Sequence, residues 1–323
     1  MHNKKVNEKY GLSIEYWVKK MISIQEYYLV MSESMSILKS FVIAICVLCS
    51  VVVLSQETVK PGKNIALYVP NTKQIFDNIP FDVGETILYN ATWGGIKAGT
   101  VSIQVKKRLF IGDNEVFQVV VQAKTSKFFS VFFKVDDKME SYFDCKSLYS
   151  LRFEKHLREG SYKEDQIIDY DHKRGIFEMN RERKNKKNVQ EGIIPYWVND
   201  PISCIFYLRV CELAVAKPFS ITINTEGKNY NVEVNVPEKE TIKTDLGKFD
   251  TFIVKPGKLA WQGRVFEKEK STLTVWLTDD EYRLPVLLKS KVKIGSLKFE
   301  IKQWKKSGSP VDNESINEEE EEK

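Results

Sequence analysis

The chain has 323 residues, of which 42% are hydrophobic and 12% aromatic, and its formal net charge is +5. This apolar content is enough for a large core and excludes global disorder. With only 16 glycines and 10 prolines and no heptad pattern, the chain is neither collagen-like nor a coiled coil. Five cysteines exclude a dense disulfide scaffold, and three histidines leave little room for a histidine-rich metal site.

The N-terminal region carries an apolar run over residues 41–54. A membrane-spanning helix needs about 20 apolar residues, so this run is short for one. Lys39 precedes it and small residues end it, which is the pattern of a secretory signal. We therefore expect a signal peptide over residues 35–55, cleaved before Gln56, and an exported protein of the periplasm or cell envelope. The alternative is a membrane anchor formed by 41–54.

The remaining chain divides into three parts. Residues 1–34 precede the signal and form an N-terminal extension of doubtful structure, which we leave out of the fold prediction. Residues 307–323 hold seven acidic side chains and almost nothing apolar, so we expect a disordered acidic tail. Residues 76–306 are expected to form a single β-rich domain.

Period-two alternation recurs through this domain, as expected for half-buried strands. The first clear pair is a hairpin of 86–93 and 100–105 around Gly94 and Gly95. Residues 181–191 are polar, basic and without periodicity, so we expect a loop there. Further alternating segments run to 303, which predicts about fourteen strands. We therefore predict an all-β fold: a large twisted antiparallel sheet curled into a half-barrel or open barrel.

One segment breaks the alternation. Asp200 and Pro201 form a helix-start signal, and residues 202–213 continue without glycine or proline. Apolar side chains surround most of this segment, as in a buried helix. We predict one helix over 200–213, packed on the concave face of the sheet. Beyond the signal, Cys145, Cys204 and Cys211 remain, an odd number that favours buried free thiols over disulfides.

The sequence contains no motif for a catalytic nucleophile, a phosphate-binding loop, a dinucleotide site or a zinc protease. We expect no enzyme activity, no catalytic residues, no cofactor and no metal. His156 and His172 are expected to be surface side chains. An acidic cluster lacks the spacing of a calcium loop and is assigned to a turn and an adjacent strand face: Asp136, Asp137, Glu140 and Asp144.

Basic residues gather in the expected loop at 181–187. An exported compartment and the lack of interleaved aromatic residues argue against a nucleic-acid partner. A solvated loop is the simpler interpretation, and contact with anionic lipid headgroups is the alternative.

Arg209 stands in the middle of the apolar helix, next to Tyr207 and close to Phe206. Burying an unpaired guanidinium costs several kcal/mol. One interpretation is a structural ion pair with a strand carboxylate, or a side chain that extends to solvent. The other is an anion receiver at the mouth of a cavity, with Phe206 and Tyr207 as further ligand contacts. Arg209, Tyr207 and Phe206 are therefore the candidate ligand-binding residues.

Six short motifs follow one another along the chain: residues 81–89, the Trp93–Gly99 hairpin, 136–141, 200–209, 244–249 and 275–280. Together they resemble the exported bacterial family called domain of unknown function 3108, over roughly residues 81–303. The resemblance implies a β-rich protein of the periplasm or cell envelope. It brings no known reaction, cofactor or catalytic residue.

Two functions are compatible with these expectations. The first is a non-enzymatic envelope protein, membrane-proximal, that holds a lipid or another apolar ligand in the curled sheet. The second is a structural or protein-interaction scaffold that uses its sheet edges or acidic tail. An open apolar cavity favours the first and a filled interior favours the second. The ligand, the partner proteins and the oligomeric state stay open.

Overall fold

The structure is a computed structural model that describes residues 73–261, 264–266, 273–291 and 295–308. The expected extension 1–34, the signal peptide 35–55 and all but the first two residues of the tail 307–323 lie outside the described residues. Within the described part of the chain, no helix has the length and apolar character needed to cross a membrane.

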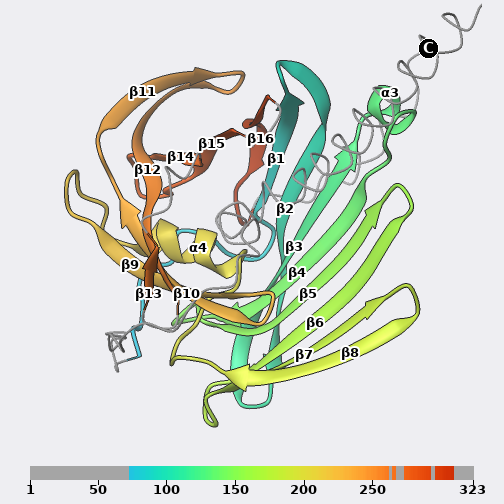
Figure 1. The fold of residues 1–323 in the computed structure, drawn as a ribbon. Helices are drawn as coiled ribbons and strands as arrows, with labels where there is room; N and C mark the ends of the chain where they lie inside the picture. The colour runs from blue at the N-terminus through green and yellow to red at the C-terminus, as the bar shows by residue number, and fades with distance from the viewer. Residues whose placement is uncertain (1–72, 262–263, 267–272, 292–294, 309–323) are drawn as a thin grey trace, which may run out of the picture.

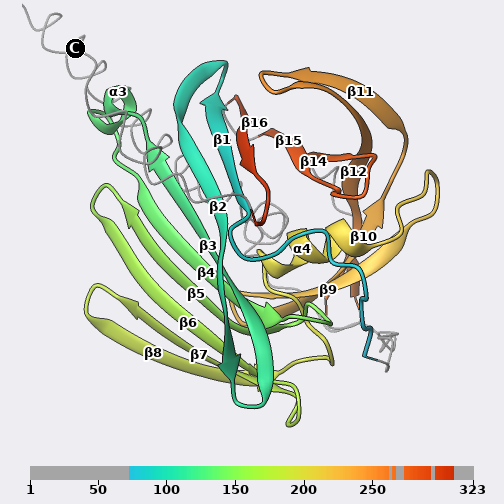
Figure 2. The same cartoon turned by 180° about the vertical axis from the view of Figure 1, so that it is seen from behind.

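The described strands form a single antiparallel sheet that curls without closing into a barrel (Figures 1 and 2). Its main path runs in the order β8-β7-β6-β5-β4-β3-β2-β1-β16-β15-β14-β12-β10-β9, and β11 and β13 each pair with β12. In chain order the strands are β1 (Thr86–Trp93), β2 (Ile96–Ile111), β3 (Asn114–Thr125), β4 (Asp136–Asp144), β5 (Ser150–Glu159), β6 (Tyr162–Asp171), β7 (Ile176–Arg183), β8 (Lys186–Ile193), β9 (Phe219–Thr225), β10 (Lys228–Asn235), β11 (Lys239–Thr244), β12 (Gly247–Trp261), β13 (Arg264–Phe266), β14 (Thr274–Thr278), β15 (Pro285–Lys291) and β16 (Ser296–Lys305). The predicted all-β fold and its open, curled sheet are confirmed.

Irregular pairing curls the sheet. The register shifts between Ala91 and Thr92 in the β1–β2 pair and after Val105 in the β2–β3 pair. Bulges of this kind bend a strand and increase its twist. At Gly99 the strands approach so closely that a Cβ atom would lie 2.1 Å from the carbonyl oxygen of Lys124, so only glycine fits.

The concave face of the sheet carries the core, with α4 (Ser203–Val210) packed against it (Figure 1). Asp200 accepts hydrogen bonds from the backbone N–H groups of Ile202 and Ser203 at 2.7 and 2.9 Å and so stabilises the turn that leads into α4, which begins at Ser203. The helix is shorter than the predicted 200–213 because Cys211 is extended, with φ −70° and ψ 145°. A second, one-turn helix, α3 (Lys127–Ser130), lies in the β3–β4 connection.

Four aromatic rings join α4 to the sheet. Phe206 on α4 lies 4.7 Å from Phe81 and 5.4 Å from Phe143, measured between ring centroids. Phe81 also lies 5.6 Å from Phe117 on β3. All four rings are buried, so this aromatic cluster contributes both area burial and edge-to-face contacts.

The expected loop at 181–191 is wrong. Residues 176–183 and 186–193 form the β7–β8 hairpin, whose turn residues Lys184 and Asn185 have φ of 50° and 58°. Two successive left-handed residues match the twist of the flanking strands. Alternation is absent because β8 ends the sheet and nearly all its side chains are exposed. Its lysines also protect an open sheet edge from pairing with other chains.

Side chains bridge the space between the two end strands, β8 and β9. Glu226, in the β9–β10 turn, forms ion pairs with Lys155 on β5 and Arg181 on β7. Asn229 donates from Nδ2 to the carbonyl oxygen of Ile193 at 2.6 Å. Polar contacts thus hold the ends together where backbone pairing does not.

Candidate functional site

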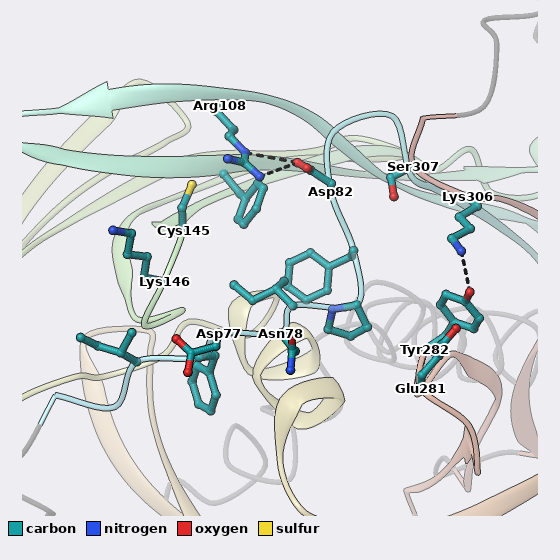
Figure 3. A pocket seen from close by; sticks show the side chains of 16 residues that line it. Asp77, Asn78, Asp82, Arg108, Cys145, Lys146, Glu281, Tyr282, Lys306 and Ser307 are labelled. Carbon is teal, nitrogen blue, oxygen red and sulfur yellow. Dashed lines mark hydrogen bonds and ion pairs between the residues drawn. The ribbon is translucent and has the colours of Figure 1, made fainter.

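A cavity of about 1060 Å³ opens where β1 begins, beneath the extended segment 75–82 (Figure 3). We call it the basal cavity. Its apolar wall is formed by six side chains: Ile75, Phe76, Ile79, Pro80, Phe81 and Phe117. A volume of this size is at the upper end of the range for small-molecule sites.

Segment 75–82 is held at both ends. The backbone N–H of Phe76 donates to the carbonyl oxygen of Lys146 at 2.9 Å, across the mouth of the cavity. At the other end, Phe81 is buried in the aromatic cluster under α4. Segment 75–82 therefore forms a fixed wall of the basal cavity.

Six charged side chains share the lining with this apolar wall, three cations and three carboxylates: Arg108, Lys146, Lys306, Asp77, Asp82 and Glu281 (Figure 3). Arg108 donates to Asp82 at 2.9 Å and lies over the ring of Phe117, 4.9 Å from its centroid. Lys306 donates to the hydroxyl of Tyr282 at 2.5 Å, and Lys146 is exposed. Because Asp82 pairs with Arg108, Lys146 and Lys306 are the cations of the lining available to the anionic head of an amphiphile that lies against the apolar wall.

Cys145 also lines the basal cavity. Burial raises the pKa of its thiol to about 12, and the negative charge of Glu115 acts in the same direction. The thiol therefore stays protonated near neutral pH, which removes the thiolate that a nucleophile needs.

The sequence-based candidate Arg209 lies behind this wall. It pairs with Glu85 through two hydrogen bonds of 2.6 and 2.8 Å, and the two side chains are 1% and 2% exposed. Arg209 also donates to the carbonyl oxygens of Tyr282 at 3.1 Å and Pro80 at 3.5 Å. The ion-pair interpretation is confirmed, and the guanidinium fastens segment 75–82 to α4.

Phe206 and Tyr207 support the same segment from α4. Phe206 packs under Phe81, and Tyr207 donates to the side-chain oxygen of Gln74 at 2.5 Å and contacts the edge of Phe76. The three candidates therefore lie together as predicted from one helix. They line neither the basal cavity nor the void described next, and instead position the wall.

Beside α4, little space is left inside the curled sheet. Beside α4 we find an apolar void of about 20 Å³, lined in part by Tyr89, Ile205 and Phe299. This is about the space of a single water molecule. Ile205 of α4 is among the side chains that leave only this small space there.

A buried polar cluster lies at the start of α4. Asp200 accepts from the hydroxyls of Ser141 at 2.5 Å and Ser150 at 2.7 Å, and Ser150 also contacts Ser203. Burial raises the pKa of Asp200, and these hydrogen bonds oppose the rise. The cluster ties β4 and β5 to the helix.

The expectation that His172 is a surface side chain is wrong, because His172 is buried. Its Nε2 donates to the carbonyl oxygen of Ser150 at 2.7 Å, and its Nδ1 accepts from the backbone N–H of Trp197. Burial lowers its pKa, so the imidazole is neutral. His172 makes no hydrogen bond to the Ser150 hydroxyl, so serine, histidine and aspartate meet here without the arrangement of a catalytic triad.

The acidic cluster at 136–144 lies entirely on β4, so the expected turn is wrong for Asp136 and Asp137. Glu140 pairs with Lys138, and Asp144 accepts from the backbone N–H of Ser147 at 2.7 Å. Among the described residues, no group of three or more histidine, cysteine or acidic side chains is arranged to hold a metal ion.

Asp137 provides a pH-dependent prediction. Burial raises its pKa to about 6, although its Oδ1 accepts from the backbone N–H of Arg158 at 2.5 Å. Because the folded pKa lies above the ordinary value, the carboxylate destabilises the fold above about pH 6, and this penalty disappears as the pH falls below the ordinary pKa. Asp137→Asn should therefore stabilise more at pH 7 than at pH 4, by about 2 kcal/mol. Urea unfolding of both proteins at both pH values measures this, and an equal effect at the two values contradicts it.

Sequence reasoning missed segment 75–82 and the aromatic α3 connection. The run of Phe76, Ile79 and Phe81 before the first strand was an available signal, but apolar residues without a period do not reveal what they cover. The cavity exists only because the chain crosses the open end of the sheet there.

Comparison with known sequences gives one family. The model of a family described as protein of unknown function, DUF3108, matches residues 88–302. No curated protein matches the chain.

Solved structures with similar folds include three from bacteria. A β-barrel-like protein of domain of unknown function DUF1849 from Brucella abortus is 12% identical, with a TM-score of 0.47, covering 70% of this chain and 98% of that one. A candidate exported protein with a YmcC-like fold from Bacteroides fragilis is 11% identical, with a TM-score of 0.33 and coverages of 73% and 100%. A candidate lipoprotein from Parabacteroides distasonis is 10% identical, with a TM-score of 0.32 and coverages of 71% and 99%.

Proposed function

Since the chain belongs to the DUF3108 family of proteins of unknown function, we propose its role from its own geometry: a non-enzymatic binder of an anionic amphiphile in the basal cavity. The observation that carries this proposal is the cavity of about 1060 Å³ with its apolar wall and the two lysines at its margin, Lys146 and Lys306. The acyl chain or ring system of the ligand lies against Phe76 and Ile79, and its anionic group faces Lys146 and Lys306.

Two features support binding without catalysis. The side chains that could act as nucleophile or base, Cys145 and His172, are a protonated buried thiol and a neutral imidazole with both nitrogens engaged. The cavity wall is held by an ion pair and an aromatic cluster, which favours a preformed site.

We also propose that the protein works in the cell envelope, on the signal pattern of residues 35–55. Native mass spectrometry of the protein purified from the envelope fraction tests location and ligand together. We expect a chain that begins at Gln56 and carries the mass of a bound amphiphile. A full-length chain without added mass contradicts both proposals.

Binding at the basal cavity itself is tested with a dansyl-labelled fatty acid as a fluorescent probe. Reversing two charges, Lys146→Glu with Lys306→Glu, should weaken probe binding by about tenfold or more, because the anionic head then meets like charges. Asn78→Trp should also weaken binding, by filling the cavity without a change of charge.

The matched control reverses two exposed lysines outside the cavity, Lys173→Glu with Lys217→Glu. It changes the net charge equally and should leave probe affinity within about twofold of the wild type. If both double variants lose probe affinity equally, the loss comes from the change in net charge, and the basal cavity is not the binding site.

The close packing of α4 against the concave face favours a second candidate, a structural or interaction scaffold of the envelope. A scaffold should carry no co-purified amphiphile, and the probe should bind no more tightly to it than to the charge-reversed variant. The native mass spectrum and the titration therefore separate the two functions.

A further inference from the structure

The β3–β4 connection exposes a cluster of large apolar side chains that the core does not explain. Phe128, Val131 and Phe132 are 66%, 82% and 69% exposed. They lie on and directly after α3, which forms an extremity of the molecule in both views of the fold (Figures 1 and 2). Soluble surfaces carry scattered apolar residues, but a contiguous apolar tip indicates a contact surface.

The tip is a built structure. Ser126 accepts from the backbone N–H of Phe129 at 3.3 Å, and Ser130 donates to the carbonyl oxygen of Ser126 at 2.8 Å. Phe129 and Phe133 pack against the core, while positions 128, 131 and 132 have the i, i+3, i+4 spacing of one helical face. Phe129 and Phe133 thus anchor the connection, and the other three side chains, which we call the apolar trio, face outward.

Basic side chains surround the trio. Lys124, Lys127 and Lys134 are exposed on the two arms of the connection, and the acidic neighbour Asp136 lies 3.9 Å from Lys124. The first residues of β2 add exposed Ile96 and Lys97 beside them, because the backbone N–H of Ser126 donates to the carbonyl oxygen of Ala98 at 2.8 Å.

We propose that α3 and the adjoining start of β2 dock the protein onto an anionic lipid bilayer, with Phe128, Val131 and Phe132 inserted among the headgroups. The charge pattern carries this choice of partner: lysines around an apolar tip face anionic headgroups while the aromatic side chains reach the acyl boundary. The tip projects at an extremity of the ribbon (Figures 1 and 2), whereas a peptide or protein ligand needs a groove or strand edge to fill. This surface is separate from the basal cavity and does not depend on it.

The test is co-sedimentation of the full chain with vesicles of phosphatidylcholine and phosphatidylglycerol, compared with phosphatidylcholine alone. Phe128→Ser, Val131→Ser and Phe132→Ser together should weaken binding to the mixed vesicles by more than about tenfold. The matched control removes three exposed apolar side chains elsewhere, Val189→Ser, Ile193→Ser and Leu246→Ser, and should bind as the wild type does. All three proteins carry the same N-terminal apolar run, so the difference isolates α3.

The charge requirement is measured separately. Lys127→Glu with Lys134→Glu should weaken binding to the mixed vesicles and leave binding to phosphatidylcholine unchanged. The Lys173→Glu and Lys217→Glu pair, with the same net charge, should have a much smaller effect. Circular dichroism and thermal unfolding should match for all variants, because the substituted side chains are exposed.

Insertion gives a further readout. Phe132→Trp should gain tryptophan fluorescence that shifts to the blue on mixed vesicles and is quenched by brominated acyl chains, whereas Leu246→Trp should not. Unchanged vesicle binding in the apolar triple variant overturns the proposal. The proposal is also overturned if the wild type self-associates with rising concentration and the apolar triple variant does not. The partner of the tip is then a second copy of this chain.

Discussion

Replacing Arg209 with methionine is expected to lower the free energy of unfolding by about 3–5 kcal/mol. Glu85 is 2% exposed and receives two hydrogen bonds from the guanidinium, so the variant leaves a buried carboxylate without its counter-charge. The carbonyl oxygens of Pro80 and Tyr282 lose donors as well. Chemical denaturation of the variant and the wild type, at the same pH, measures the difference.

The double variant Arg209→Met with Glu85→Met separates the lost pairing from lost packing. Replacing a buried ion pair with apolar side chains of similar volume is often nearly neutral, so the double variant should recover most of the stability. Recovery will be incomplete because Glu85 also accepts from the indole N–H of Trp304 at 3.2 Å. Solvent-exposed ion pairs contribute about 1 kcal/mol or less to stability. If Arg209→Met changes the free energy of unfolding by no more than this, water reaches the Arg209–Glu85 pair and the expectation is wrong.

Phe206→Ala is expected to lower the free energy of unfolding by about 3–5 kcal/mol. Its ring fills the space between Phe81 and Phe143, and α4 cannot move to close the cavity because Asp200 and Arg209 fix both of its ends. Truncation should also loosen Phe81, so the dansyl fatty acid should bind the basal cavity more weakly.

Phe128→Ala is the matched control, the same truncation at an exposed position. Its effect on stability should stay within about 0.5 kcal/mol. Equal losses at positions 128 and 206 would contradict the burial that the structure assigns to them. A stable Phe206→Ala variant that keeps full probe affinity would separate α4 from the basal cavity.

The two proposed surfaces lie toward opposite ends of the same strands. The basal cavity is lined by Arg108 on β2 and Phe117 on β3, and α3 follows the far end of β3. A protein docked through α3 therefore turns its basal cavity away from the bilayer, so that a ligand exchanges with the aqueous side or with a partner there.

Much of the fold could be predicted because local alternation reports burial directly. Along Thr86–Trp93 every second residue faces the core, and a period of two permits few structures besides a strand. Asp200 followed by Pro201 marked the helix start for an equally local reason, since both residues act on backbone groups within three positions. The strand β8 was not predicted because an exposed edge strand needs no apolar face and so shows no alternation.

The candidate site was predicted only in part. Arg209 was recognisable as a charge that needs a partner, but that partner is Glu85, 124 positions away in the chain. The role of Phe206 likewise depends on Phe81, which reaches it only when segment 75–82 crosses the end of the sheet. For α3 the apolar residues were visible, but their division into partly buried Phe129 and exposed Phe128 was not.

The sequence by itself determined the strand periodicity, the position of the helix, the family resemblance and the need of Arg209 for a counter-charge, because each is written in neighbouring residues. Only the tertiary structure decided how α4 packs on the concave face, that a cavity opens beneath segment 75–82 and that an aromatic tip stays outside the core. These are contacts between distant segments, and the curl of the sheet sets their distances. Local pattern carries no information on what space remains once such segments have packed.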